Sequence, residues 1–459
     1  MRRGAIEQAA TLAGLELAAD TDVTVEGDDP VLPSPFHLGE GASTALALVG
    51  QEANRIWQER GGKSQSLAID IRHAAASLVS YSLLQVDGAA LGRPDRGGPP
   101  ITWVWRCADG RWILLHGSFN DTPGIIEELG LDMDAEADDI QAAVLKRGSQ
   151  ELEDALGAKG LCAAICRTND EWLGHPQGQV LASKPVIELT KVGDSPAEPF
   201  DEGDRPLSDV RVLDLTRVLA GPTCARTLAE HGADVLHIAS PNLPTFDGFE
   251  MDTGHGKRQA YIDLNEPHQA EKLRELIRGA DVFSQGFQHR SLQRRGFGVE
   301  QVAALRPGVI YVSENAFGHD GPWAERPGWE QLAQATTGVM VIQGGEDHPN
   351  LAPAAMNDYT TGYFAALGTM MALRRRAAEG GSWRVTVSLS QTSMWYYKLG
   401  HDLDPSGAPG LGETSGFTEE RDTDYGRMTY VRPPLQMSET WPRWELATAP
   451  LGSGEASWN

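Results

Sequence analysis

The sequence predicts an α/β fold in which a Rossmann-like parallel sheet domain is joined to a smaller α+β domain. In the second half, short apolar runs of strand length alternate with helical segments such as Glu271–Gly279. Strands that are apolar throughout are buried on both faces, as they are in a parallel sheet. In the first half, two short runs flank a turn at Asp109-Gly110, which predicts a β-hairpin.

Each half follows its own order of elements. Those expected in the first half are a helix over Gly39–Arg60 that ends at Gly61-Gly62, a strand over Ser66–Ile71, a helix over His73–Leu84, hairpin strands over Ile101–Arg106 and Trp112–His116, and helices to about Gly174. The strands expected in the second half are Val210–Leu215, Asp234–Ile238, Gln259–Leu264, Asp281–Ser284 and Val309–Ser313. Ligands bind such sheets at the carboxyl ends of the strands, so we expect the site in the loops that follow them.

Composition narrows the class of protein. The 459 residues include 39 basic and 64 acidic side chains, for a net charge of −25. This acidity argues against nucleic acid or an anionic membrane as a partner, since both need a basic face. No apolar run is long enough to span a membrane and no secretory core follows the N-terminus, so we expect a cytoplasmic protein.

The cysteines and the glycine pattern further limit the cofactors that the protein is expected to bind. The four cysteines are too few and too scattered for a disulfide framework or a metal site, and Cys162 and Cys166 are expected to be buried thiols in a helical run. The loop after the first strand of the second half has only Gly221, and the next strand ends in Ala239-Ser240 without a carboxylate. We therefore expect neither a metal nor NAD.

A weak internal repeat relates the two halves. One constant shift along the chain places Glu40 on Asp358, Gly50 on Gly368, Gly62 on Gly380 and Ile69 on Val387. In both segments a polar start, an apolar helix, a glycine stop and a β-branched strand follow one another. Two copies of one element and a chance agreement of two ordinary helix–strand units are both open interpretations.

Asp358 stands at the start of a predicted helix, before the apolar run Phe364–Leu373. A carboxylate in this place is typical of an N-cap that accepts hydrogen bonds from free amides. The helix N-terminus also favours negative charge, which would keep the carboxylate ionised and available as a nucleophile.

Basic residues gather beside predicted strand ends, against the overall acidity. They are Lys257 and Arg258 after Gly256, His289 and Arg290 after Gln288, and Arg294 with Arg295. Each could belong to a solvated face, but their repeated placement indicates a site for a multiply charged anion. The glycine-rich segment Phe317–Pro322 is typical of a turn, and no Ser-His-Asp arrangement emerges.

Together these stretches resemble the class III CoA-transferase family, the CaiB/BaiF type that includes carnitine and bile-acid CoA-transferases and α-methylacyl-CoA racemases. The segments that carry the resemblance are Val212–Pro222, Leu228–Val235, Gly256–Arg258, Gly296–Gly298, Ile310–Ser313, Gly318–Pro322, Arg326–Trp329 and Asp358–Gly362.

The first half resembles the part of the family that normally comes later. Trp103–His116 is similar to the small-domain hairpin, and Asn169–Trp172 with Lys184–Glu188 to its closing segment. The domain order is thus reversed, as in a circular permutation or a trimmed fused pair. The expected division is an N-terminal extension at 1–33, the back part of one copy with the small domain at 34–200, a Rossmann-like CoA-binding domain with the catalytic aspartate at 201–400, and a C-terminal segment at 401–459.

The resemblance implies an acyl-CoA:carboxylate CoA-transferase whose substrates are an acyl-CoA and a carboxylic acid. Asp358 matches the family's catalytic aspartate, which would form a mixed anhydride and then an aspartyl-CoA thioester. Family members are interlaced homodimers, so a homodimer is expected here. Positions that match coenzyme A contacts of the family are Val218, Leu219, Lys257, Phe287 and Arg294. Arg258 and Arg326 lie at or near further basic positions of the family's coenzyme A site. Gly97-Gly98 matches the family's glycine-rich lid loop but is shorter.

Departures from the family pattern keep two alternatives open. His255 and Ala239-Ser240 replace usual family residues, and Glu40 could mark a degenerate second site. A racemase of the same family would need a histidine where Gly328-Trp329-Glu330 stands, which disfavours racemisation. A non-catalytic CoA-binding relative is the other alternative, and the presence of Asp358 weighs against it.

Overall fold

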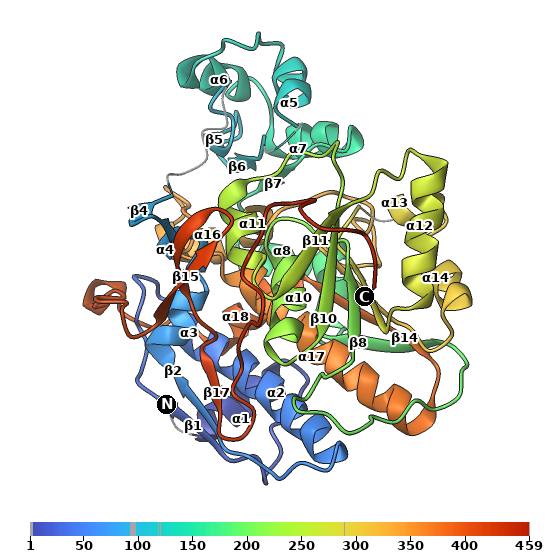
Figure 1. Cartoon of the computed structure of the whole chain (residues 1–459). Coiled ribbons are helices and arrows are strands. Elements are labelled where there is room, and N and C mark those ends of the chain that lie inside the picture. The colour runs from blue at the N-terminus through green and yellow to red at the C-terminus, as the bar shows by residue number, and fades with distance from the viewer. Residues whose placement is uncertain (1–2, 92–97, 118, 120, 289, 459) are drawn as a thin grey trace.

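The computed structural model describes residues 3–91, 98–117, 119, 121–288 and 290–458. Its largest sheet has the strand order β11-β10-β9-β12-β13-β14-β8. Figure 1 labels β8, β10, β11 and β14 of this sheet. The strands are β8 Glu188–Gly193, β9 Arg211–Asp214, β10 Asp234–Ala239, β11 Lys257–Tyr261, β12 Val282–Gln285, β13 Ile310–Asn315 and β14 Ser382–Ser388. Neighbours from β11 to β14 are parallel, and β8 runs antiparallel to β14. The parallel α/β sheet is confirmed, and β9 to β14 have the 3-2-1-4-5-6 order usual in doubly wound sheets.

Helices cover both faces of this sheet. They are α10 Ala220–Glu230, α11 Asp247–Thr253, α12 Pro267–Arg278, α13 Ser291–Arg294, α14 Val299–Leu305 and α17 Met356–Glu379. The sequence sets the ends of α12, because Pro267 occupies its first turn and Gly279 follows its last residue. Its apolar face buries Leu273 and Ile277 in one cluster with Phe283 of β12. This packing fixes the strand from which a loop of the site emerges.

The first half builds a second, smaller sheet of order β1-β2-β17, from β1 Val23–Glu26, β2 Leu67–Asp70 and β17 Leu435–Met437. Its helices are α1 Arg3–Leu12, α2 Leu38–Glu59, α3 Ile71–Ser77 and α4 Ser80–Leu83. The predicted helix over 39–60 and strand over 66–71 are confirmed, with ends that differ by a single position. The predicted helix over 73–84 is instead two short helices, because the chain leaves helical geometry at Val79 (φ −131°, ψ 18°).

The smaller α+β domain carries the sheet β5-β6-β7, with β5 Trp103–Arg106, β6 Trp112–Leu115 and β7 Ala163–Ile165. Helices α5 Asp121–Leu129, α6 Ala137–Val144 and α7 Ser149–Ala158 pack on it around a core of its own (Figure 1). The predicted hairpin is confirmed. The predicted helix at Cys162–Cys166 is wrong, because this short apolar run pairs as a strand with β6. Both thiols are buried, as expected.

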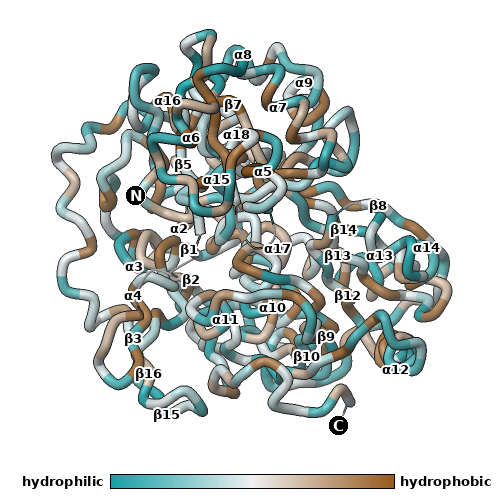
Figure 2. The backbone as a smooth tube through the Cα atoms, turned by 90° about the horizontal axis from the view of Figure 1, so that it is seen from above, coloured by the Kyte–Doolittle hydropathy of each residue, from teal (hydrophilic) through white to brown (hydrophobic). Residues whose placement is uncertain are grey.

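The remaining helices and one further sheet join the two halves of the chain. α8 Asn169–Gly174, α9 Pro176–Ala182, α15 Glu330–Thr337, α16 Val339–Gly344 and α18 Leu389–Leu399 complete the helices. A further sheet has the order β15-β16-β3-β4, from β15 Thr418–Thr423, β16 Gly426–Val431, β3 Gln85–Val86 and β4 Ala89–Ala90. Figure 2 shows α10 and α17 between the small sheet with α3 and the strands of the large sheet. In the part of the chain that is described, no helix is both long and apolar enough to cross a membrane.

Candidate active site

The strand order of the large sheet reverses between β9 and β12, and we name the region at the carboxyl ends of these two strands the crevice. β9 and β12 are neighbours whose connections leave in opposite directions, and ligands of such sheets bind at the carboxyl ends of these two strands. Val218 lies in the loop after β9, and Phe287 lies in the loop after β12. Val218 has φ 72°, which is a strained conformation for a β-branched residue and is typical of ligand-binding loops. Leu219 follows it as the N-cap of α10.

Asp358 is the third residue of α17, one turn before the point where α17 crosses α10. At the crossing, a Cβ on Gly362 would lie 2.6 Å from the carbonyl oxygen of Ala220, so the two backbones are in contact. The N-cap of α17 is Ala355, and the Asp358 side chain accepts no hydrogen bond within the described chain. The expected capping bond is therefore absent. Asp358 is a partly accessible carboxyl group one helical turn before the contact of α17 with the first residue of α10.

Two further carboxyl groups surround Asp358. Burial, followed by the charges of Glu330 and Glu314, raises the pKa of Asp358 well above its usual range. This direction is opposite to the effect expected from the helix N-terminus, because loss of solvation and carboxylate repulsion outweigh the helix dipole. A raised pKa makes the ionised form a stronger nucleophile, although less of it is present at neutral pH.

Glu330 is held against the start of α17. Its Oε1 accepts hydrogen bonds from Gln334 Nε2 at 2.7 Å and from the Asn357 backbone N–H at 3.4 Å. Burial raises the pKa of Glu330 to about 7. The side chain of Asn357 is fully buried at the start of α17, next to Glu330.

Glu314 lies at the carboxyl end of β13, between Gly221 in the first turn of α10 and Gly286 in the loop after β12. A Cβ would fall 2.6 Å from its Oε1 at Gly221 and 2.5 Å from it at Gly286. Burial raises the pKa of Glu314 to about 8, and its Oε2 has no hydrogen-bond partner in the described chain. These glycines are therefore required by the carboxyl group that sits between them. Sequence reasoning missed Glu314 and Glu330 because neither belongs to a motif that marks a carboxylate cluster.

The small domain forms a roof over the start of α15. His116 stacks on Trp329 with ring centroids 5.9 Å apart, and Phe119 lies 5.0 Å from the same indole. Phe119 also contacts Phe246, at 4.9 Å, and the guanidinium of Arg217, at 4.9 Å. Trp329 immediately precedes Glu330, so these rings close the side of the crevice that faces the small domain.

Several predicted basic contacts are engaged elsewhere. Lys257 Nζ lies 2.9 Å from Asp214 Oδ2 and donates to the Pro222 carbonyl at 2.9 Å, in a fully buried ion pair. Arg258 pairs with Asp234 at the amino end of β10, away from the crevice edge. Both side chains hold the sheet together here, and Lys257 could meet a phosphate only by leaving its ion pair.

The other predicted contacts are scattered. Arg294 is exposed at the end of α13 near the loop after β12. Arg326 points into the small domain, where it donates to the Ala163 carbonyl at 2.8 Å and stacks on Trp323. Gly98 is exposed beside Met133, while Gly97 lies outside the described residues. Val218, Leu219 and Phe287 thus lie in the segments that follow β9 and β12. The roles of these residues, of the basic residues and of the lid glycines remain predictions.

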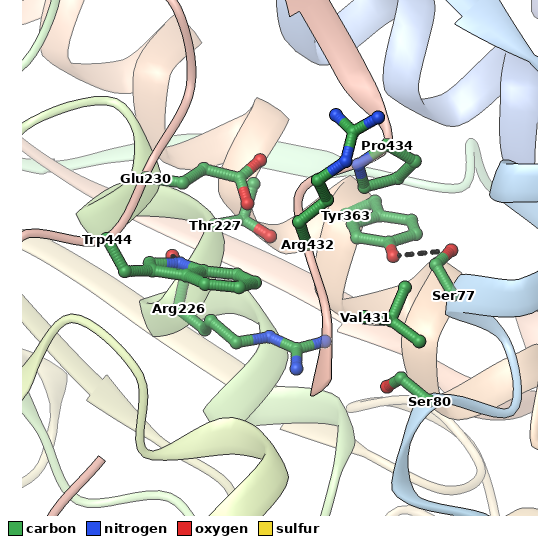
Figure 3. Close-up of a pocket in the computed structure, with 10 residues that line it drawn as sticks. All are labelled: Ser77, Ser80, Arg226, Thr227, Glu230, Tyr363, Val431, Arg432, Pro434 and Trp444. Carbon is green, nitrogen blue, oxygen red and sulfur yellow. Dashed lines mark hydrogen bonds between the residues drawn. The ribbon is translucent and has the colours of Figure 1, made fainter. Parts of the chain in front are cut away.

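A second polar cluster anchors α17 on the side away from Asp358. Tyr359 Oη and Ser80 Oγ both donate to Asp252 Oδ2, at 2.9 and 2.8 Å, and Arg226 Nη1 lies 3.1 Å from the same oxygen. Next to Arg226 is a cavity of about 10 Å³, room for one water molecule, lined by residues of both halves (Figure 3). Tyr359, the residue after the candidate nucleophile Asp358, is thereby fixed by hydrogen bonds to α4 and α11.

Comparison with known proteins assigns this fold and site to a family. The family model of CoA-transferase family III matches residues 207–415. An acyl-CoA transferase of Gibberella moniliformis is 31% identical over 415 residues, covering 81% of this chain and 73% of that protein. The acetyl-coenzyme A transferase nodX of Hypoxylon pulicicidum is 30% identical over 423 residues, covering 81% and 71%. A formyl-CoA:oxalate CoA-transferase of Rhodopseudomonas palustris is 36% identical over 199 residues, covering 40% and 46%.

The chain therefore belongs to CoA-transferase family III, and it is an enzyme of that family. The matched segment contains the crevice loops, the carboxyl groups of Glu314 and Glu330, and Asp358. The first half lies outside the family match, although the longer relatives align with most of the chain.

Proposed function

We propose that this enzyme is an acyl-CoA:carboxylate CoA-transferase in which Asp358 is the nucleophile. The observation that carries the proposal is the accessible, unpaired Asp358 carboxyl at the edge of the crevice, beside the strained Val218 loop. Relatives named as acyl-CoA and formyl-CoA:oxalate transferases support the same chemistry. Val218, Leu219 and Phe287 would contact coenzyme A, which enters as part of the acyl-CoA substrate.

The first half-reaction transfers CoA to the enzyme. A carboxylate oxygen of Asp358 attacks the thioester carbonyl, the carbon–sulfur bond breaks, and the electron pair leaves with the CoA thiolate. The thiolate then attacks the Asp358 carbonyl carbon of the mixed anhydride and expels the donor acid as a carboxylate. The product is an aspartyl-CoA thioester, which preserves the energy of the original thioester.

The second half-reaction runs these steps in reverse with the acceptor. The incoming carboxylate attacks the aspartyl thioester, CoA leaves again as thiolate, and the thiolate attacks the acyl carbonyl of the new anhydride. New acyl-CoA is formed and the Asp358 carboxylate is regenerated. No proton is taken up or released over the cycle. The Asp358 carboxyl must therefore already be ionised when it attacks the thioester.

Glu330 and Glu314 suit a site that handles several anions. Their raised pKa values, about 7 and about 8, keep a large fraction of each carboxyl group neutral at neutral pH. A neutral carboxyl repels neither the Asp358 carboxylate nor an incoming acid, and it can donate a hydrogen bond to a developing oxyanion or thiolate. The roof of His116, Phe119 and Trp329 would keep water away from the mixed anhydride. Water would otherwise hydrolyse the anhydride before CoA is transferred.

A racemase of the same family remains the second candidate function. The residue after Trp329 is Glu330, and its buried carboxyl beside Asp358 could in principle form a proton-shuttling pair. We favour transfer because the relatives are named as transferases. Proton exchange at the carbon next to the thioester, in the absence of an acceptor acid, would instead support the racemase.

Covalent trapping tests the proposal. The enzyme is incubated with acyl-CoA and hydroxylamine, which converts an aspartyl anhydride or thioester to a hydroxamate, and the modified peptide is identified by mass spectrometry. Modification at Asp358 that requires acyl-CoA is expected. Modification elsewhere, or none while labelled CoA still exchanges between thioester and free acid, would contradict the assignment. An exposed matched control is Asp347→Asn, which should be trapped like the unaltered enzyme.

A further inference from the structure

The helix–strand–helix unit at Asp358 occurs twice in the chain. α2 begins at Leu38 and α17 at Met356, and the same separation along the chain lies between the starts of α3 at Ile71 and α18 at Leu389. The residues before α3 and α18 are both side-chain caps: Asp70 accepts from the Arg72 N–H and Ser388 accepts from the Gln391 N–H. Equal spacing at both helix starts is typical of a duplication rather than of two unrelated units.

The strands around the two units also correspond. In the small sheet, Leu67 of β2 lies between Val23 on a parallel strand and Met437 on an antiparallel one. In the large sheet, Val385 of β14 lies between Val312 on a parallel strand and Leu189 on an antiparallel one. Leu67 and Val385 are related by the same shift as the helix starts. The sheet β1-β2-β17 therefore repeats the order and directions of β13-β14-β8.

A glycine makes the same close contact in each copy. A Cβ on Gly50 of α2 would lie 3.1 Å from Leu67 and 3.0 Å from Leu435. A Cβ on Gly368, the equivalent position of α17, would lie 2.6 Å from Val385 and 2.8 Å from Ile187. The partners occupy equivalent positions in the two sheets, because Leu435 and Ile187 each precede by two positions the residue opposite Leu67 or Val385. The repeat extends to side-chain packing.

The third strand of each sheet comes from the other half of the chain. β8 belongs to the first half and completes the sheet of the second, whereas β17 belongs to the second half and completes the sheet of the first. In the first half the small domain lies between α3 and β8, and its Phe119 contacts Trp329 beside Glu330. In the second half, 400–434 between α18 and β17 carry only η1, β15 and β16. The second copy thus has no small domain.

The position equivalent to Asp358 in the first copy is Glu40, and its surroundings differ. Glu40 Oε2 lies 2.8 Å from His37 Nδ1, and His37 Nε2 lies 3.0 Å from Asp402. Within the described residues, the sheet β1-β2-β17 has no strands corresponding to β9 and β12, so no crevice adjoins Glu40. An ion-paired carboxyl without a crevice cannot serve the reaction proposed for Asp358.

We infer that the chain is a fused pair of strand-exchanged copies, complete within one molecule, with a single working site at Asp358. The first copy supplies the roof and the return strand β8, and the second supplies the crevice and the nucleophile. The number of sites rests on the proposed function, whereas the exchange within one chain does not.

Cross-linking tests the exchange directly. Ala68→Cys with Gln436→Cys joins opposed residues of β2 and β17, and Thr190→Cys with Arg384→Cys joins opposed residues of β8 and β14. The native cysteines are buried, so they should not interfere. After oxidation, a denaturing gel without reductant should show a cross-linked species at the mass of one chain. A product of twice that mass, or no cross-link at either pair, would overturn the inference, and each single-cysteine variant is the control.

Intact mass spectrometry counts the sites. After incubation with acyl-CoA and an acid quench, one CoA per chain is expected on the unaltered enzyme and on Glu40→Gln, and none on Asp358→Asn. Two CoA per chain, or loss of the adduct in Glu40→Gln, would overturn the single site. Absence of any adduct on the unaltered enzyme would contradict the proposed function, while the cross-links would still decide the exchange.

Discussion

The carboxyl groups of Asp358 and Glu330 lie close enough that the charge of Glu330 raises the pKa of Asp358. Glu330 is itself held in place by Gln334 and by the first turn of α17. The acid–base state of the nucleophile therefore depends on its neighbour, which makes several measurable properties predictable.

Replacement of the nucleophile should separate binding from chemistry. Asp358→Asn keeps the shape of the side chain but removes the attacking oxygen anion, so we expect CoA transfer to fall at least about 1,000-fold. Affinity for CoA should change less than about threefold, since Asp358 makes no hydrogen bond that holds the crevice. Isotope exchange and calorimetry measure the two quantities. Equal losses in both would indicate a binding role instead.

Removal of the neighbouring charge should move the pH profile. In Glu330→Gln the carboxylate repulsion disappears, so the pKa of Asp358 falls and the acid limb of kcat/KM should shift to lower pH. Glu300→Gln, an exposed change, should leave the profile in place. A shift of the limb to higher pH would contradict the proposed arrangement.

Relief of strain in the crevice loop should stabilise the fold and weaken binding. Val218 has φ 72°, a region that glycine enters without cost. We expect Val218→Gly to raise the free energy of unfolding by about 1 kcal/mol and to weaken CoA binding, because the loop is no longer held in one conformation. Denaturant unfolding and calorimetry test both effects. Destabilisation by this change would show that the strain is not the controlling factor.

Loss of the roof should let water compete with the acceptor. Phe119→Ala removes the ring between Trp329 and Phe246, so hydrolysis of acyl-CoA relative to transfer should rise about tenfold. Phe200→Ala, whose ring contacts Arg60 instead, is the matched control. An unchanged ratio of hydrolysis to transfer would mean that other groups exclude water.

Buried Glu230 should make the protein less stable as the pH rises. Burial raises its pKa to about 8, so between about pH 4.5 and 8 the unfolded chain loses a proton that the folded chain keeps. Stability should fall over this range by up to about 1.4 kcal/mol per pH unit, and Glu230→Gln should reduce the slope. Unfolding at several pH values measures it, with exposed Glu346→Gln as control. A slope that Glu230→Gln leaves unchanged would assign the effect to Glu314 and Glu330.

Sequence patterns predicted the secondary structure correctly where the local signals agree with the fold. The alternation of apolar runs predicted the large sheet, and the turn at Asp109-Gly110 predicted the hairpin β5–β6. The strand β7 was mistaken for helix because a short apolar run carries no periodicity that separates the two, and its pairing with β6 is long-range.

The sequence motifs predicted part of the candidate site. The Val218 loop follows strand β9 and Asp358 lies in the first turn of α17, and the roles of both remain predictions. Glu314 becomes part of the site only through the contacts of Gly221 and Gly286, which are distant in sequence. Lys257 was expected to meet a phosphate, but its partner Asp214 lies far away along the chain and pairing between them has no local signal.

The exchange of β8 and β17 has a consequence for how the molecule comes apart. Neither sheet can lose its outer strand without releasing a segment on which the other depends, so the halves share their resistance to denaturation instead of melting one after the other. We expect a single sharp transition from a chain that descends from two copies.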